Sequence, residues 1–250
     1  MTAISCHRNG GVLRIELDRP EKLNAVNTPM LTELLTRLGE SEADDVRVVV
    51  LTGAGRAFCS GGDLSGRETE GAVVAAIKVV QAITALPKPV VAGVQGAAAG
   101  LGCSLALACD LVVAARSAFF QLAFSKVGLM PDGGASALVP AAIGRARAAR
   151  MAMLAEKLSA EMAFEWGMIS HVVDDVGYDG ELEAVIQTLA NGPTMSYRWI
   201  KRALAEATLE ALPGVGDIEV QGQSLLVRTD DFREGVSAFA DRRRPQFRGH

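Results

Sequence analysis

The sequence has little that could bind a metal and no excess of positive charge. Its 250 residues include three histidines and four cysteines, and none of the cysteines forms a C-x-x-C pair. No metal site is therefore expected, and the thiols are predicted to be reduced and buried. Lysine and arginine number 25 against 29 aspartates and glutamates, a formal charge of -4. The chain has no excess of positive charge that would attract a polyanion, so no nucleic-acid partner is expected.

The sequence also lacks an uninterrupted hydrophobic run long enough to span a membrane. Its longest apolar stretch, residues 89–108, is broken by glycines and by the polar Gln95 and Ser104, which indicates buried elements of a globular core. Residues 1–11 show neither a basic segment followed by an apolar one nor an arginine-rich amphipathic pattern. We therefore expect a protein without membrane association, located in the cytoplasm.

What is present is enough hydrophobic sequence for a full core, arranged as alternating strands and helices. Hydrophobic residues make up 49% of the chain and charged residues 22%, as in ordinary globular proteins. Alternation or β-branched runs predict strands at 13–17, 46–52, 89–94, 110–115 and 119–122. Helical spacing predicts a helix capped by Thr28 with Leu31, Leu34, Leu35 and Leu38 on one stripe, and further helices over 71–86 and 100–109. This alternation predicts an α/β core.

The last part of the chain has a mainly helical pattern, beginning at about Arg145. From Pro193 onward, Trp199, Ile200 and Leu204 fall on one side of a predicted helix, and an apolar face of this kind favours a partner. We therefore expect two regions. Residues 1–192 form the α/β core with the site, and residues 193–250 form a helical oligomerisation region.

Two glycine-rich turns, each following a β-branched strand, are the most informative features of the chain. The first reads AFCSGGDL over residues 57–64, and the second reads QGAAAGLGCS over residues 95–104 and continues into a helix. Glycines let the backbone approach a ligand, and a helix N-terminus favours negative charge. Two such turns can direct two amides at one oxygen atom. Neither turn fits a phosphate-binding loop, a dinucleotide fingerprint or a serine-hydrolase elbow.

These turns belong to a series of blocks that resembles the crotonase (enoyl-CoA hydratase/isomerase) family over nearly the whole chain. In order, the blocks are RPEKLNA at 19–25, AFCSGGDL at 57–64, KPVVAGVQGAAAGLGCSLALACD at 88–110, GLMPDGG at 128–134, WGM at 166–168 and EGVSAF at 234–239. The resemblance implies a spiral of ββα units with a C-terminal helical trimerisation region. It also implies an acyl-CoA thioester substrate, no cofactor beyond the coenzyme A of that substrate, and a homo-oligomer, either a trimer or a dimer of trimers.

The resemblance further implies roles for individual residues. The backbone amides of Gly62 and Leu101 would form an oxyanion hole, although the family commonly has glycine at the second position and Leu101 departs from that pattern. The residues expected to bind coenzyme A are Lys22, Ser60, Gly61, Asp63 and Leu64, with Phe239 and Arg242 reaching the coenzyme A of a neighbouring copy. Phe124 and Met130 would line the acyl pocket. Lys22 and Arg242 are equally explained as solvated surface charges.

The expected chemistry depends on which acids the site contains. Hydratases of the family place two glutamates that activate a water, and those positions here hold Ser104 and Phe124. Asp132 is the remaining acid in a motif-bearing turn, where a subset of family isomerases carry their acid/base. Apolar neighbours should raise its pKa. The resemblance therefore favours an enoyl-CoA isomerase that shifts a double bond between the 3-enoyl and 2-enoyl positions.

Other interpretations stay open from the sequence alone. Asp132 precedes Gly133, Gly134 and a helical run, so it could instead be a helix N-cap. Hydration through another acid and hydrolytic dehalogenation with Asp132 as nucleophile are further crotonase reactions, although no histidine lies between Lys22 and Asp132 to assist a dehalogenase. A non-catalytic acyl-CoA-binding protein would also fit the missing pair of glutamates.

Overall fold

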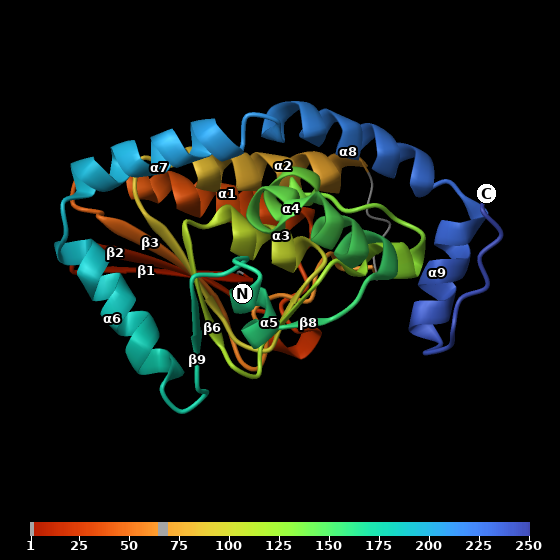
Figure 1. Cartoon of the computed structure of the whole chain (residues 1–250), viewed down its shortest axis with the longest axis horizontal. Helices are drawn as coiled ribbons and strands as arrows, with labels where there is room; N and C mark the ends of the chain where they lie inside the picture. The colour runs from red at the N-terminus through yellow and green to blue at the C-terminus, as the bar shows by residue number, and fades with distance from the viewer. Residues whose placement is uncertain (1–2, 65–69) are drawn as a thin grey trace.

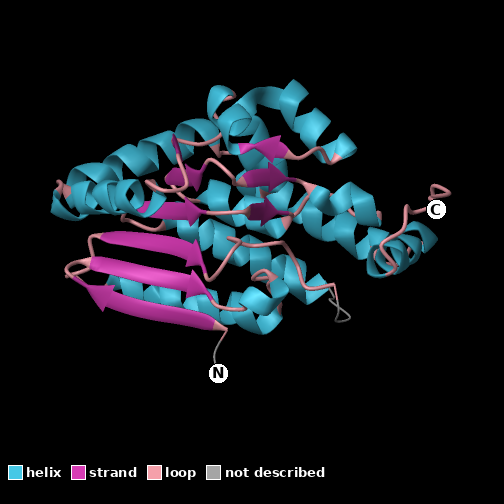
Figure 2. Cartoon of the chain, turned by 90° about the horizontal axis from the view of Figure 1, so that it is seen from below, coloured by secondary structure: helices cyan, strands magenta, loops and turns pink. Residues whose placement is uncertain are grey.

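A mostly parallel sheet forms the centre of the protein in the computed structural model, which describes residues 3–64 and 70–250. In spatial order its described strands are β1 (Ile4–Asn9), β2 (Val12–Leu17), β3 (Val48–Gly53), β4 (Val90–Val94), β6 (Leu111–Ala115) and β9 (His171–Val173). Strands β1 and β2 form an antiparallel hairpin, and the other neighbours are parallel. Figure 2 shows the strands side by side with helices packed against them.

Both faces of this sheet are covered, as the β-branched runs predict. Along β3, Val48 and Val50 pack with α6 (Tyr178–Asn191) in a smaller core, and Val49 and Leu51 point into the larger core on the opposite face. Side chains alternate across a strand, so a strand buried on both faces reads as a continuous apolar run. The strand begins at Val48, two residues after the predicted start.

A smaller sheet lies beside the first and gives the chain its repeating unit. Its order is β5 (Ala97–Ala99), β7 (Phe119–Gln121) and β8 (Leu158–Ser159). Strand β5 follows β4 and leads into α3 (Leu101–Ala108), and β7 follows β6 and is followed by α4 (Ala135–Leu154). Both successions are ββα units, the arrangement implied by the family resemblance. The chain therefore has the predicted α/β crotonase-type fold.

The helices on the larger core begin with α1 (Thr28–Gly39) and α2 (Glu70–Ala85). The N-cap of α1 is Asn27, whose side chain accepts the Met30 amide, so the prediction of Thr28 as the cap is wrong by one residue. Thr28 is already helical. Leu35 is also 36% exposed because it lies at the edge of the apolar stripe. Short 3-10 turns are η1 (Pro20–Lys22), η2 (Glu40–Glu42) and η3 (Ala123–Val127).

The final part of the chain is less uniformly helical than the sequence pattern suggests. Helix α4 begins at Ala135, where the helical run after Gly133 and Gly134 was expected, and bends at Gly144, which has a φ of +77°. Strands β8 and β9 and helix α5 (Ala160–Glu165) follow it. The short strands were missed because two or three residues carry almost no periodic signal.

Three helices close the described chain: α7 (Thr194–Thr208), α8 (Leu212–Leu226) and α9 (Asp230–Ala240). Figure 1 shows α7 and α8 along one long edge and α9 at one end. Helix α8 contacts α2 and α4, and α9 contacts η3. The proposed division at residue 193 and the role of these helices in oligomerisation stay predictions. Within residues 3–64 and 70–250, no helix has the length and apolar character needed to cross a membrane.

Candidate active site

The two glycine-rich turns lie side by side, joined by backbone hydrogen bonds. The Cys59 amide donates to the Ala97 carbonyl, and the Ala99 amide donates to the Cys59 carbonyl, each at 2.9 Å. Cys59 and Ala98 thereby form a parallel bridge. Because the pairing is parallel, Gly62 and Leu101 each follow their bridge residue by three positions. The structure therefore brings together the two amides that the sequence singled out.

Glycine is required at the point where the turns approach each other. A Cβ on Gly61 would lie 3.1 Å from the Ala99 carbonyl oxygen, and a Cβ on Gly100 would lie 3.5 Å from the Gly61 Cα. The φ angles of Gly61 and Gly100 are +112° and +52°, which L-residues with side chains rarely adopt. A side chain at Gly61 would crowd the Ala99 carbonyl and push the turns apart, and a side chain at Gly100 would require a strained backbone.

The amides that follow these glycines are available to an external acceptor. Among the described residues, neither the Gly62 amide nor the Leu101 amide donates a hydrogen bond to the protein. Leu101 is the first residue of α3, and the first amides of a helix have no partner within the helix. The helix N-terminus also carries partial positive charge. The arrangement can stabilise negative charge on a bound oxygen atom.

Asp132 lies in the turn that packs against the second of these loops. The Ser104 hydroxyl on α3 donates to the Asp132 carbonyl oxygen at 2.8 Å. A Cβ on the neighbouring Gly133 would lie 2.4 Å from Leu101 Cδ1, so the Leu101 side chain fills the space beside this turn. The Asp132 turn therefore packs against the first turn of α3, which begins at Leu101.

The alternative role of Asp132 as a helix N-cap is wrong. The N-cap of α4 is Gly134, which has no side chain that could accept a hydrogen bond from a helix amide. The amides of Gly134 and Ser136 instead donate to the carboxylate of Glu219, at 2.7 and 2.9 Å. The carboxylate of Asp132 is thus not consumed by capping.

Two buried polar residues of α8 (Leu212–Leu226), Glu219 and Gln223, contact this turn, and neither stands in a motif that could have been recognised from the sequence. Gln223 Nε2 donates to Asp132 Oδ2 at 2.8 Å and to the Met130 carbonyl at 2.9 Å. Glu219 lies one helical turn earlier and is fully buried. Polar residues on a helix ordinarily indicate its solvent-exposed side, so only the long-range packing of α8 against α4 identifies these two.

The surroundings of Asp132 change its titration. Its side chain is half-buried, and burial raises the pKa of its carboxyl from 3.8 to about 7. The charge of Glu219 acts in the same direction, and the hydrogen bond from Gln223 opposes both by favouring the charged form. A carboxyl with a pKa near 7 can both accept and release a proton at neutral pH.

The residues predicted to bind coenzyme A gather in part around the first turn. Asp63 forms an ion pair with the Arg19 guanidinium at 2.9 Å, and only 12% of its side chain is exposed. Its carboxylate therefore holds the first turn against the block that begins at Arg19. The Ser60 hydroxyl donates to the Lys22 carbonyl at 3.3 Å, and the Lys22 side chain is exposed. Gly61 joins this cluster, and Leu64 is half-buried at the end of the described range.

The predicted acyl-pocket and partner-facing residues lie in three places. The ring of Phe124 is buried, with Cζ 3.9 Å from where a Cβ of Gly100 would be, so it borders the second turn. Met130 packs on α8, with its sulfur 2.2 Å from the Cβ position of Gly222. Phe239 lies on α9 and Arg242 just beyond it, and both are exposed. The reach of Phe239 and Arg242 to a neighbouring copy stays a prediction.

The cysteines and acidic residues offer no alternative centre in the described ranges. Cys59, Cys103 and Cys109 are buried, and burial raises the pKa of Cys59 and Cys103 to about 12. The prediction of a buried thiol is wrong for Cys6, which is partly exposed on the edge strand β1, 3.6 Å from the Glu40 carboxylate. No group of three or more histidine, cysteine, aspartate or glutamate side chains among residues 3–64 and 70–250 could hold a metal ion.

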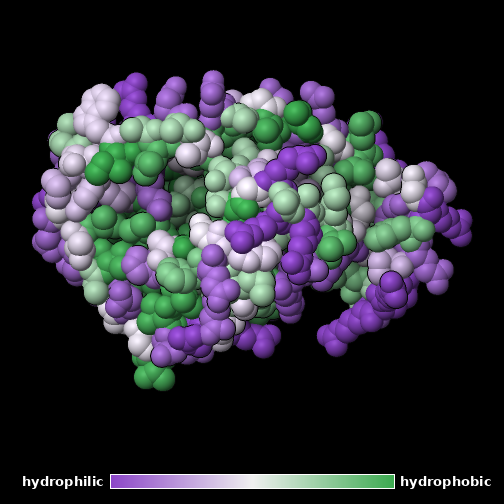
Figure 3. Space-filling view, in the orientation of Figure 1, coloured by the Kyte–Doolittle hydropathy of each residue, from purple (hydrophilic) through white to green (hydrophobic). Residues whose placement is uncertain are grey.

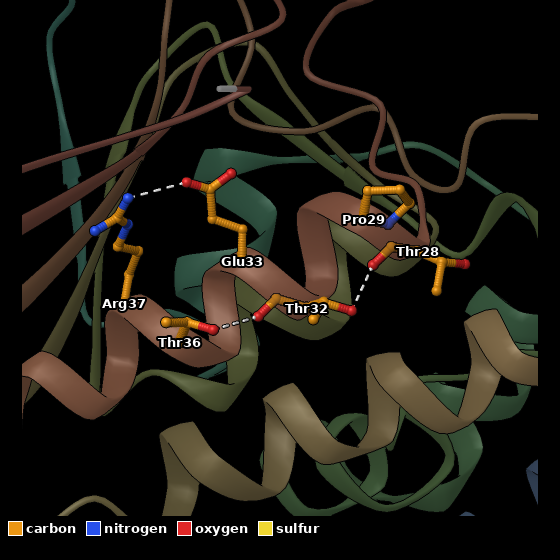
Figure 4. A pocket seen from close by; sticks show the side chains of 6 residues that line it. All are labelled: Thr28, Pro29, Thr32, Glu33, Thr36 and Arg37. Atoms are coloured by element: carbon orange, nitrogen blue, oxygen red, sulfur yellow. Dashed lines mark hydrogen bonds and ion pairs between the residues drawn. The ribbon is translucent and has the colours of Figure 1, made fainter. Parts of the chain in front are cut away.

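An open groove on the outer side of α1 lies apart from these features (Figure 4). It has a volume of about 650 Å³ and is lined by Thr28, Pro29, Thr32, Glu33, Thr36 and Arg37. Arg37 pairs with Glu33 at 3.1 Å across it. None of the predicted site residues lines this groove, so the candidate active site is the region between the two glycine-rich turns and Asp132.

Comparison with known families agrees with this geometry. The family model described as Enoyl-CoA hydratase/isomerase matches residues 7–250. The chain belongs to this family. One relative, the 1,2-epoxyphenylacetyl-CoA isomerase of Escherichia coli (strain K12), is 44% identical over 100% of this chain and 99% of its own length. A probable enoyl-CoA hydratase of Rhodobacter capsulatus is 43% identical over 96% of this chain and 95% of its own length.

A solved structure extends the match to three dimensions. The crystal structure of an enoyl-CoA hydratase from Mycobacterium avium subsp. paratuberculosis K-10 is 42% identical, has a TM-score of 0.95 and covers 98% of each chain. The protein is therefore an enzyme of the enoyl-CoA hydratase/isomerase family, the crotonase superfamily. The names of these relatives include both an isomerase and hydratases, so family membership alone leaves the reaction open.

Proposed function

We propose that the protein is an acyl-CoA isomerase that moves a double bond between the 3-enoyl and 2-enoyl positions through a thioester enolate. The observation that carries this proposal is the carboxyl of Asp132, with a pKa raised to about 7, in a turn that packs against Leu101; among the described residues, the Gly62 and Leu101 amides donate to no protein group. The positions at which family hydratases carry their two glutamates hold Ser104 and Phe124.

The two amides serve the first step. The Gly62 and Leu101 N–H groups donate to the thioester oxygen and become more effective as negative charge develops on it. One such donor typically contributes about 10²–10³ in rate. The charge stabilisation makes the proton on C2, next to the thioester, easier to remove.

Asp132 moves the proton. In the described residues Gln223 occupies Oδ2 of the carboxylate, and Oδ1 has no hydrogen-bond partner. Oδ1 takes the proton from C2 of a 3-enoyl thioester, and the electron pair moves onto the thioester oxygen to give the enolate, with the double bond between C3 and C4 still in place. The same carboxyl then delivers the proton to C4, and the double bond between C2 and C3 forms as the thioester carbonyl is restored, with an effect on the order of 10²–10⁴ for acid-base assistance. No water, cofactor or second acid is consumed.

Hydration has less support from the surroundings of the site. The Ser104 hydroxyl is engaged with the Asp132 carbonyl, and the Phe124 ring has no acid-base group. Glu219 is the other carboxylate that contacts this turn, but both of its oxygens accept hydrogen bonds from backbone amides at the start of α4. None of these three groups is free to activate a water.

A second candidate substrate has a specific observation in its favour. The relative at 44% identity is named as an isomerase of 1,2-epoxyphenylacetyl-CoA, a ring-derived thioester. The same two amides and Asp132 would serve an isomerisation of such an epoxide. A ring-derived epoxide therefore belongs in the substrate panel beside linear enoyl thioesters.

The test compares the parent with Asp132→Asn on a linear 3-enoyl-CoA and a linear 2-enoyl-CoA, followed by absorbance of the conjugated thioester and by product mass. We expect isomerisation without a mass increase, reduced at least about 100-fold in Asp132→Asn, with thioester binding retained. Asp217→Asn, an exposed change on α8, is the matched control. Hydration that persists in Asp132→Asn would contradict the proposal, and binding without turnover by the parent would indicate a non-catalytic binding protein.

A further inference from the structure

We infer that Gln223 and Glu219 of α8 are positioning residues for Asp132, with Gln223 orienting its carboxylate and Glu219 acting on it through charge. This inference rests on the proposed role of Asp132 as the acid/base. It adds two residues that are distant in the sequence. Gln223 lies 91 positions from Asp132, and Glu219 lies 85 positions from Gly134, whose amide it accepts. Helix α8, in the C-terminal region of the chain, then takes part in positioning the acid/base.

Gln223 fixes the carboxylate from one side. Its Nε2 donates to Asp132 Oδ2 at 2.8 Å and to the Met130 carbonyl at 2.9 Å, so one amide group holds both ends of the Met130–Asp132 segment. Gln223 is 2% exposed, and its Oε1 has no partner in the described residues. Turning the amide over would lose both donors, so the observed orientation is the favourable one. Oδ1 of Asp132 is left to face the substrate.

Glu219 acts on the same turn by another route. Its fully buried carboxylate accepts the amides of Gly134 and Ser136 and so attaches the beginning of α4 to α8. A second negative charge near Asp132 disfavours ionisation of Asp132. Gln223 donates a hydrogen bond that favours the charged form. The two α8 residues thus have opposite effects on one carboxyl.

Other charged and titratable groups around the turn are few. On α3 the nearest such group is the buried thiol of Cys103, and on η3 it is the exposed Lys126. On α4 the first basic residue is the exposed Arg145. Of the described residues, Glu219 is the charged group that shifts the pKa of Asp132. The opposition between Glu219 and Gln223 is therefore open to direct measurement.

The test is the pH profile of kcat/KM for two variants of the full-length enzyme. The base is active when charged, so activity falls as the pH drops through the pKa of Asp132. Gln223→Leu keeps the size and removes the donor, and we expect the acid limb to move to higher pH by about 1 unit. Glu219→Gln keeps an acceptor and removes the charge, and we expect the limb to move to lower pH. A loss of packing alone would not give shifts of opposite sign.

A second measurement does not need substrate. The carboxyl of Asp132 is titrated by infrared difference spectroscopy, with Asp132→Asn as the reference, in the parent and in each variant. Asp217→Asn on the same helix should leave the titration unchanged. If Glu219→Gln does not fold, Gln223→Glu tests the effect of charge instead. It places a negative charge next to the Asp132 carboxyl and should raise the pKa of Asp132 further than Gln223→Leu does.

The outcomes separate this inference from the proposed function. Unchanged titration, or shifts of the same sign in Gln223→Leu and Glu219→Gln, would overturn the positioning role even where Asp132→Asn is inactive. Full activity of Asp132→Asn would instead overturn the proposed acid/base, while the infrared titration would still report the effect of α8 on this carboxyl.

Discussion

At the scale of the residue, the raised pKa of Asp132 links reactivity to stability. Its carboxyl has a pKa of about 7, against 3.8 ordinarily, chiefly because burial disfavours the charged form. A group that holds its proton more tightly in the folded state stabilises the fold at low pH, below about 4. That contribution is lost as the pH rises through about 7. The site therefore holds a carboxylate that costs stability at the pH at which it is a useful base.

Replacing Asp132 with asparagine should remove this cost. We expect the free energy of unfolding of Asp132→Asn, relative to the parent, to increase by about 2–4 kcal/mol between pH 4 and pH 8. Urea denaturation at several pH values measures the difference. The exposed Asp217→Asn should show no such trend. A gain in stability that is independent of pH would mean that the carboxyl of Asp132 titrates normally in the folded protein.

At the scale of the element, one buried cation attaches α7 to the sheet. The Lys201 ammonium is 8% exposed and donates to Asp110 Oδ2 at 2.8 Å and to the carbonyl of Ile83, near the end of α2, at 2.8 Å. Asp110 also accepts the Val90 amide at the start of β4. Burial raises the pKa of Asp110, and the charge of Lys201 opposes that shift. Three elements thus depend on one ion pair.

Lys201→Met should therefore destabilise the protein strongly. The change leaves the Asp110 carboxylate, whose side chain is 28% exposed, without its counter-charge. Breaking a fully buried pair typically costs about 3–5 kcal/mol, and solvent screening of Asp110 lowers the expected cost to about 2–3 kcal/mol. The double variant Lys201→Met/Asp110→Asn should recover part of the loss. Arg116→Met, which breaks an exposed pair with Asp174, is the control and should change stability far less. Denaturation curves of the four proteins at pH 7 test this, and equal losses for Lys201→Met and Arg116→Met would contradict it.

Elements with strong local patterns were predictable from the sequence, and those without were not. The runs that became β3 and β4 are apolar on both faces, so each could be recognised alone. Strand β1 was missed because only Ile4 is buried in a segment that includes polar residues and lies at the sheet edge. Asn27 and Thr28 can both cap a helix, so the first turn of α1 was placed one residue late.

The site likewise contains residues that sequence motifs predict and residues that they do not. Gly62, Leu101 and Asp132 stand in motifs that a sequence displays directly, and the structure brings the two turns and the Asp132 turn together. Gln223 and Glu219 stand in no motif and reach the turn from a helix at the other end of the chain. Their burial depends on how α8 packs against α4, which local patterns do not specify.

At the scale of the whole molecule, the C-terminal helices leave apolar side chains at the surface. Trp199, Ile200 and Leu204 on α7 are 58%, 52% and 60% exposed, and Ile218 and Leu225 on α8 are 61% and 68% exposed. Figure 3 shows apolar residues interspersed with hydrophilic ones over this edge of the molecule. An apolar surface of this kind on several helices favours association between copies. The predicted trimer or dimer of trimers would cover this apolar surface.

The mass in solution tests that prediction. We expect the parent to run at three or six times the chain mass of 26.2 kDa by light scattering after size exclusion. Trp199→Asp introduces a charge on the exposed face of α7 and should shift the mass toward a single chain, because an unpaired charge is costly in an apolar interface. Val176→Asp is the matched control, since Val176 is fully exposed just before α6. A monomeric parent, or equal dissociation of both variants, would show that these helices are not the interface.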